Sequence, residues 1–117
     1  MKSRGRTWTL ETATERVTGG MILSLRGRIS SATAASFASA MAAARAETPN
    51  VVIDLEEVDY ISGPGVAVLR EVATGSGPRA ILCGLQEPVR ITLELAGALD
   101  DIVIEDTRGK AIGKLGG

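Results

Sequence analysis

Residues 51–69 read VVIDLEEVDYISGPGVAVL, and this stretch decides the fold of the chain. Its first five residues form a short, β-branched and mostly apolar run, which predicts a central strand covered on both faces. The run Ser62-Gly63-Pro64-Gly65 predicts a turn and a helix start, after which Val66 and Leu69 repeat at helical spacing. A strand, a turn and a helix in this order are the basic unit of an α/β domain.

The segment before this stretch predicts a β-hairpin and a helix. Residues 7–10 alternate and open a strand, Gly19-Gly20 marks a turn, and residues 21–26 indicate a buried strand that Gly27 ends. The hydroxyl side chains within residues 30–33 offer N-cap oxygens for an alanine-rich helix. The apolar face of that helix carries Ala34, Phe37, Met41 and Ala44.

The segment after residue 69 predicts two more strands and two more helices. Residues 80–83 and 102–104 are short apolar runs of the kind that form buried strands. The helix between them ends at Gly97 in a left-handed conformation, and Asp106 or Thr107 caps the last helix. The inner faces of these two helices carry Val89, Leu93 and Ala96, and Ala111, Ile112 and Leu115.

The elements follow the order ββαβαβαβα, which predicts an α/β domain. We expect a mainly parallel sheet of four to five strands with an antiparallel edge strand at its N-terminus. Helices pack on this sheet, and its parallel connections are right-handed. The 117 residues fit a single domain over residues 1–117, in which residues 1–5 form a flexible tail.

Composition disfavours several classes of partner. Lys and Arg total 13 against 14 Asp and Glu, so a net charge of -1 provides no basic surface for nucleic acid. Aromatic residues are scarce, which also argues against base stacking. The apolar runs are too short to span a bilayer, and no secretory signal follows the basic N-terminus. We therefore expect a cytoplasmic protein with no membrane partner.

The sequence lacks the residue types of the common catalytic and metal sites. Without histidine, Ser-His-Asp and Cys-His arrangements cannot form. A Ser-Lys dyad is disfavoured because lysine occurs only near the two ends of the chain. The single cysteine, Cys83, lies in an apolar run that predicts a buried, inert thiol, and it cannot assemble a zinc site alone. We expect no catalytic residue, metal or cofactor, and no enzymatic activity.

Four acidic residues cluster around the C-terminal end of the predicted central strand: Asp54, Glu56, Glu57 and Asp59. One interpretation is a divalent-metal or acid/base site, since ligands of open α/β sheets bind outside the carboxyl ends of the strands. The favoured interpretation is a solvated loop, because runs of charge are usually solvated.

The turn Gly63-Pro64-Gly65 follows a strand and precedes a helix, as a phosphate-binding turn does. It lacks the third glycine of a dinucleotide-binding motif and the Lys-Ser/Thr pair of a P-loop. Pro64 also removes an amide that could hold an anion. We therefore favour a plain helix cap over a nucleotide site.

Residues 51–69 resemble the signature of the STAS domain. Members of this family carry an aliphatic strand ending in Asp-Leu, a hydrophobic pair, a turn with Ser and Gly, and a helix that opens with aliphatic residues. Residues 25–29 (LRGRI) resemble the family's Leu-x-Gly-x-Ile/Leu strand end, and residues 93–99 (LELAGAL) resemble the helix before its last strand. The resemblance covers nearly the whole chain and implies the STAS fold.

The resemblance implies a protein-binding module of the anti-sigma factor antagonist type. Such proteins bind an anti-sigma factor, a serine kinase with the histidine-kinase-like ATPase fold, and so free a sigma factor that regulates transcription. Phosphorylation of a Ser in the turn before the second helix blocks binding, because a phosphate adds about -1.5 to -2 charges to the docking surface. The chain itself is expected to be a monomer or a weak homo-oligomer. Carried onto this sequence, the docking residues are Ser30, Ser31, Thr33, Ser62, Gly63, Pro64, Gly65, Val66 and Arg70.

The sequence departs from the family at the phosphorylated turn, which usually reads Asp-Ser-Ser/Thr-Gly. With Gly65 aligned, the family Asp falls on Ser62, the phospho-acceptor on Gly63 and the next residue on Pro64. A second frequently acidic family position falls on Ser30. Either Ser62 serves as a relocated acceptor, or the switch is lost and the protein binds constitutively or binds a different partner. We favour the second, because Ser62 is well placed as the N-cap of the helix.

Two other functions stay open beside the leading one. The missing acceptor is also consistent with a STAS scaffold or sensor-complex component that packs with other STAS domains. A small-ligand or nucleotide binder at Gly63-Pro64-Gly65 is the third hypothesis.

Overall fold

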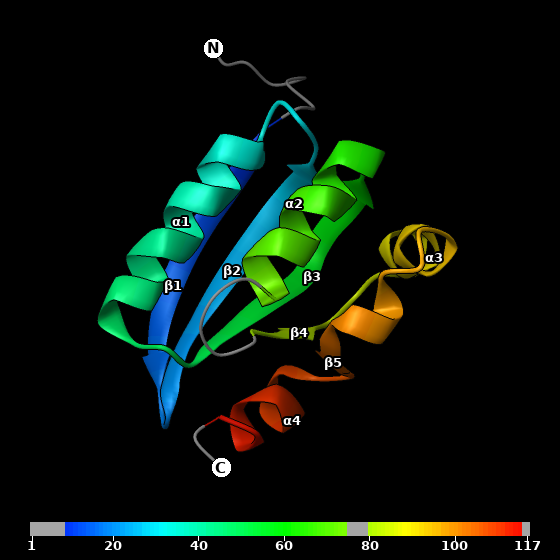
Figure 1. Ribbon diagram of the computed structural model, residues 1–117. Helices are drawn as coiled ribbons and strands as arrows, with labels where there is room; N and C mark the ends of the chain where they lie inside the picture. The colour runs from blue at the N-terminus through cyan, green and yellow to red at the C-terminus, as the bar shows by residue number, and fades with distance from the viewer. Residues whose placement is uncertain (1–8, 75–79, 116–117) are drawn as a thin grey trace.

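The structure is a computed structural model that describes residues 9–74 and 80–115, and Figure 1 shows their arrangement. The described strands form one sheet in the order β1-β2-β3-β4-β5. β1 pairs with β2 in antiparallel fashion, and the other neighbours are parallel, so the predicted mixed α/β sheet is confirmed. The strands are β1 (Leu10–Val17), β2 (Gly20–Ile29), β3 (Val51–Ile61), β4 (Ile81–Cys83) and β5 (Val103–Glu105).

Helices lie on both faces of this sheet. One face carries the larger core, in which α1, α2 and α3 pack on β2, β3 and β4 (Figure 1). On the opposite face, α4 covers a small second cluster of Ile22, Val52, Ile81 and Cys83 through its buried Ala111. The helices are α1 (Ala34–Glu47), α2 (Gly63–Thr74), α3 (Glu87–Leu95) and α4 (Arg108–Gly113), with a 3-10 turn η1 (Leu99–Asp101) that the sequence did not predict.

β2 does not end at Gly27, which corrects the sequence prediction. The strand continues to Ile29, and its register against β3 shifts after Gly27. Gly27 has a φ of 122°, and a Cβ here would lie 2.3 Å from the carbonyl oxygen of Thr9. Glycine therefore allows β2 to bend beside β1 without ending the strand.

β3 is more than twice as long as the predicted strand of residues 51–55. Its second half keeps pairing with β2, and Val58 and Ile61 are buried there. The charged residues on either side of Val58, Glu57 and Asp59, are exposed, and the Arg26 guanidinium lies 2.9 Å from the Glu57 carboxylate. The acidic run is thus part of a strand with one solvent-facing side, and the predicted solvated loop was wrong in this respect.

Most predicted helix faces and ends agree with the structure. Phe37, Met41 and Ala44 are buried under α1, and Gly97 ends α3 with a φ of 71°. Ala96 is exposed because α3 ends one residue earlier, so its place in the inner stripe was wrong. The last helix is capped by Thr107, whose hydroxyl accepts a hydrogen bond from the Lys110 amide. The expected tail at residues 1–5, the start of the first strand at residues 7–8 and the chain break at residues 75–78 lie outside the described residues.

Candidate functional site

The carboxyl ends of β2 and β3 and the N-termini of α1 and α2 meet at one edge of the molecule, at the top of Figure 1. We call this the docking edge because the sequence analysis predicts partner binding here, and it comprises residues 30–33 after β2 and residues 62–66 after β3. The Ser62 amide donates to the carbonyl oxygen of Ile29 at 2.9 Å, so the two segments are joined directly. The docking residues that the sequence singled out are therefore brought together, except Arg70, which lies farther along α2.

The α1 side of the docking edge is an internally bonded turn. The Thr33 hydroxyl accepts from the Ser30 amide at 3.0 Å and donates to the carbonyl oxygen of Arg28 at 2.8 Å. The Ser30 hydroxyl accepts from the Ala32 amide at 3.2 Å. Ser30 and Thr33 are only 6% and 4% exposed, whereas Ser31 is exposed. Ser30 and Thr33 thus shape this turn, and Ser31 is the side chain that faces outward. The predicted side-chain cap of α1 was wrong, because the hydroxyl of its N-cap residue Thr33 bonds within the turn and not to the helix.

The α2 side is organised by Ser62. Its hydroxyl accepts from the Gly65 amide at 3.0 Å, and its carbonyl oxygen accepts from the Val66 amide at 2.8 Å. Ser62 is therefore the N-cap of α2, as the sequence predicted. Gly63 and Pro64 are exposed, while Gly65 and Val66 are buried.

The same hydrogen bonds weaken the case for a phosphate site at this turn. An anion at a helix N-terminus needs free amides. Pro64 has none, and the amides of Gly65 and Val66 already donate to Ser62. The helix cap is the use of this turn that the geometry supports.

Arg70 ties α2 to the segment after α3. Its Nε donates to Asp101 Oδ2 at 2.9 Å, and its Nη2 contacts the same oxygen. Both side chains are nearly half exposed, so water reaches this ion pair. Arg70 thus contributes a paired guanidinium to the surface beside the docking edge.

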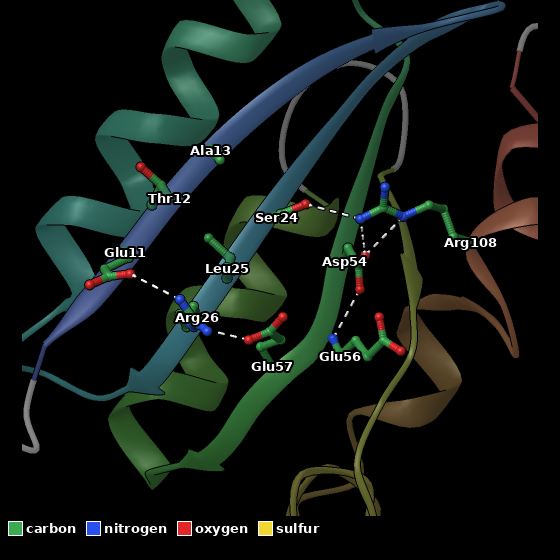
Figure 2. A pocket seen from close by; sticks show the side chains of 10 residues that line it. All are labelled: Glu11, Thr12, Ala13, Ser24, Leu25, Arg26, Asp54, Glu56, Glu57 and Arg108. Carbon is green, nitrogen blue, oxygen red and sulfur yellow. Dashed lines mark hydrogen bonds and ion pairs between the residues drawn. The ribbon is translucent and has the colours of Figure 1, made fainter.

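A groove of about 260 Å³ lies beside α4, on the face of the sheet opposite to α1, α2 and α3 (Figure 2). In its floor, Asp54 is only 5% exposed and accepts two hydrogen bonds from Arg108, from Nη2 at 2.6 Å and from Nε at 3.1 Å. These bonds raise the pKa of the Arg108 guanidinium above its ordinary value. The lining residues are Glu11, Thr12, Ala13, Ser24, Leu25, Arg26, Asp54, Glu56, Glu57 and Arg108.

The sequence placed Asp54, Glu56 and Glu57 near one another but missed Arg108, which lies about fifty residues downstream. No local pattern joins an arginine at the start of α4 to a carboxylate in β3, because packing of α4 across the sheet brings them together. Among the described residues, no group of three or more His, Cys, Asp or Glu is arranged to hold a metal ion.

Cys83 lies under α4 with no solvent exposure. Burial, with the negative charge of Asp54 nearby, raises the pKa of its thiol to about 11. A thiol needs a lowered pKa to be reactive near neutral pH. The predicted buried cysteine is confirmed.

The family model of the STAS domain matches residues 11–111. The chain belongs to the STAS domain family. The resemblance carried by residues 51–69 is thereby confirmed. No curated protein matches the chain in sequence. Within residues 9–74 and 80–115 of this STAS domain, no helix has the length and hydropathy needed to cross a membrane.

Solved structures share the fold of this STAS domain. An anti-sigma factor antagonist from Mycobacterium paratuberculosis is similar with a TM-score of 0.79 at 23% identity, covering 91% of this chain and 93% of its own. SpoIIAA in its unphosphorylated form is similar with a TM-score of 0.65 at 19% identity, covering 89% and 95%. The structure of SLC26A9 matches with a TM-score of 0.70 at 13% identity, over 80% of this chain but 19% of that chain. At these identities the likeness shows the fold.

Proposed function

We propose that this STAS domain is a non-enzymatic regulator of the anti-sigma factor antagonist type. Its docking edge binds an anti-sigma factor, which is a serine kinase with the histidine-kinase-like ATPase fold. This binding frees a sigma factor that regulates transcription. The observation that carries the proposal is the strand-turn-helix geometry at residues 51–69, where Ser62 caps α2 beside an exposed Gly63 and Pro64. Solved anti-sigma factor antagonists share the fold around it.

We further propose that binding is constitutive. SpoIIAA has been solved in phosphorylated and unphosphorylated forms. In this chain the family's acceptor position is Gly63, which has no hydroxyl, and the neighbouring Ser62 hydroxyl is engaged by the Gly65 amide. A kinase would have to break this cap to reach the Ser62 oxygen, which supports a docking edge without a phospho-switch.

Capture from the source cells with the tagged full chain as bait tests the proposal. We expect a captured protein with the histidine-kinase-like ATPase fold, identified by mass spectrometry. Gly63→Glu places a negative charge at the exposed centre of the docking edge and is expected to reduce capture at least tenfold. Gly63→Ala is the matched control, since a Cβ at Gly63 meets nothing within 4 Å. Absence of such a protein, or equal capture by both variants, would overturn the proposal.

Intact-mass spectrometry of the chain isolated from its own cells, with fragmentation across Ser62, tests whether binding is constitutive. We expect Ser62 to be unmodified under conditions in which other STAS proteins of the same cells are phosphorylated. A phosphate on Ser62 would contradict constitutive binding and would show that Ser62 serves as a relocated phospho-acceptor.

A second candidate is an assembly component that packs with other STAS domains, which the missing hydroxyl at Gly63 also favours. Sedimentation of the purified chain and of the chain in lysate separates the candidates. A large complex made of STAS proteins alone would favour the assembly component, and a complex with a kinase-fold partner would favour the antagonist.

A further inference from the structure

The carboxylate of Asp54 joins two parts of the molecule that are far apart in the sequence. Its Oδ1 accepts a hydrogen bond from the Glu56 amide at 2.9 Å, within β3. Its Oδ2 accepts from Arg108, the first residue of α4, at 2.6 and 3.1 Å (Figure 2). The side chain is 6% exposed, so water is a weak competitor for either bond.

The first of these bonds lies at a bulge in β3. Ser24 of β2 faces Asp54, but Arg26 faces Glu57, so β3 has one residue more than β2 over this interval. A bulge leaves a residue outside the regular ladder. Here the Asp54 carboxylate accepts a hydrogen bond from the amide of Glu56, which lies within the bulge between Asp54 and Glu57.

The segment after β4 packs against the same bulge. The Gln86 side-chain amide donates to the carbonyl oxygen of Glu56 at 2.7 Å. A Cβ on Gly84 would lie 3.2 Å from Asp54 Oδ1 and from Glu56 Cβ, so the backbone approaches closely. The bulge is thus fixed from within β3 and from its neighbour.

The phase of β3 after the bulge determines where the docking edge lies. A shift of one residue in a strand moves every following side chain to the other face. After this bulge, Val58 points into the core. A second register shift follows, since Gly27 faces Val58 but Arg28 faces Tyr60, and beyond it Ile61 is buried and the Ser62 amide bonds to Ile29. Together with this second shift, the bulge at Asp54 sets the position in which Ser62 caps α2.

α4 has a second anchor that does not involve Asp54. The Lys114 ammonium lies 2.6 Å from the Glu105 carboxylate, at the opposite end of the helix from Arg108. Arg108 also contacts Ser24 at 3.3 Å and Glu15 at 3.4 Å. The two ends of α4 can therefore be loosened separately.

We propose that Asp54 is a positioning residue that couples the seating of α4 to the geometry of the docking edge. Arg108 holds the Asp54 carboxylate in the orientation in which Oδ1 accepts from the Glu56 amide. When Arg108 leaves, the carboxylate loses this restraint, the bulge loosens, and the second half of β3 and the start of α2 become less ordered. The meaning of this coupling for partner binding rests on the proposed function, but the coupling itself does not.

Amide hydrogen exchange measured by NMR on the full chain tests the coupling. Arg108→Gln is expected to speed exchange at least tenfold at the amides of Glu56, residues 58–63 and residues 65–66, as well as in α4. Lys114→Gln is the matched control, and it is expected to speed exchange in α4 alone. Glu15→Gln removes only an exposed contact of Arg108 and is expected to change neither region.

Core amides of Leu23 and Ile53 serve as the internal reference for global unfolding. The coupling is overturned if Arg108→Gln speeds exchange at these core amides as much as at Glu56. It is also overturned if exchange in α4 becomes faster while exchange in residues 56–66 is unchanged. The exchange measurement involves no partner. Failed capture of an anti-sigma factor with intact coupling would therefore count against the proposed function alone.

Discussion

At the scale of single residues, the turn before α2 holds two glycines with different surroundings. A Cβ on Gly65 would lie 2.4 Å from the carbonyl oxygen of Ile29 and 2.9 Å from its carbonyl carbon, whereas a Cβ on Gly63 would meet nothing within 4 Å. The two nearest atoms that a Cβ on Gly65 would meet belong to the backbone, which cannot move aside as a flexible side chain can. Gly65 is thus required by close packing between α2 and the end of β2, and Gly63 is not.

Gly65→Ala is therefore expected to lower the free energy of unfolding by about 1–3 kcal/mol, the usual cost of an overpacked site. Gly63→Ala, the matched control, is expected to leave it unchanged or raise it by about 0.5–1 kcal/mol, because alanine restricts the unfolded chain. Urea unfolding followed by far-UV circular dichroism measures both values. Equal stability of the two variants would show that the turn can relax around a side chain at Gly65.

At the scale of elements, α3 shows how a helix end is built. The Ala98 amide donates to the carbonyl oxygen of Leu93 at 2.9 Å, and the Gly97 amide donates to that of Glu94 at 3.0 Å. With Gly97 at a φ of 71°, this is a Schellman motif, and the buried Leu93 and Ala98 supply its apolar contact. The motif turns the chain back toward η1 and β5.

Gly97→Ala is expected to cost about 1–2 kcal/mol of folding stability, because a side chain is disfavoured in the left-handed region. Gly113→Ala in α4 is the matched control, expected to be neutral or stabilising by up to about 1 kcal/mol. A Cβ at either position meets nothing within 4 Å, so the two variants differ in backbone conformation rather than in packing. Thermal unfolding of both variants checks the difference, and a Gly97→Ala variant as stable as the parent would contradict it.

At the scale of the whole molecule, the two faces of the sheet are covered unequally. Three helices bury the larger core on one face, while the short α4 covers only part of the other (Figure 1). The groove lies beside α4 on that face (Figure 2). Cys83 lies in the small cluster under α4. Its thiol therefore becomes exposed when α4 leaves the sheet or the whole domain unfolds.

The raised pKa of Cys83 links global stability to pH. Its folded pKa of about 11 lies above the ordinary value of 9.0, so the unfolded chain loses this proton first as pH rises. The thiol's contribution to stability is fully present below pH 9.0 and is lost as pH rises through about 11.

Urea unfolding across this pH window, for the parent chain and for Cys83→Ala, measures this link. We expect the variant to be less stable at neutral pH, because it loses buried volume, but to depend less steeply on pH above 9.0. Parallel pH profiles for the two proteins would show that Cys83 does not ionise on unfolding in this range.

Much of the fold follows from the sequence, because its signals are local. The β-branched run at residues 51–55, the turn at residues 62–65 and Gly97 each predict their own element, since strand propensity, capping and left-handed backbone depend on near neighbours. The family resemblance and the role of Ser62 as N-cap were predictable for the same reason.

Features that depend on distant residues were decided by the tertiary structure. Residues 56–60, which are polar except for Val58, continue β3 because β2 pairs with them and leaves their polar side chains facing solvent. Ser30 and Thr33 turn inward because their hydroxyls complete the backbone hydrogen bonds of the chain that ends β2.

The pairing of Asp54 with Arg108 has the same origin. Both residues are visible in the sequence, but a carboxylate in the middle of a strand and an arginine fifty residues later carry no shared pattern. They meet because α4 crosses the sheet above β3, where burial makes an unpaired carboxylate costly and a guanidinium satisfies it. The sequence determined which elements form, whereas packing across the sheet decided which charges they bring together.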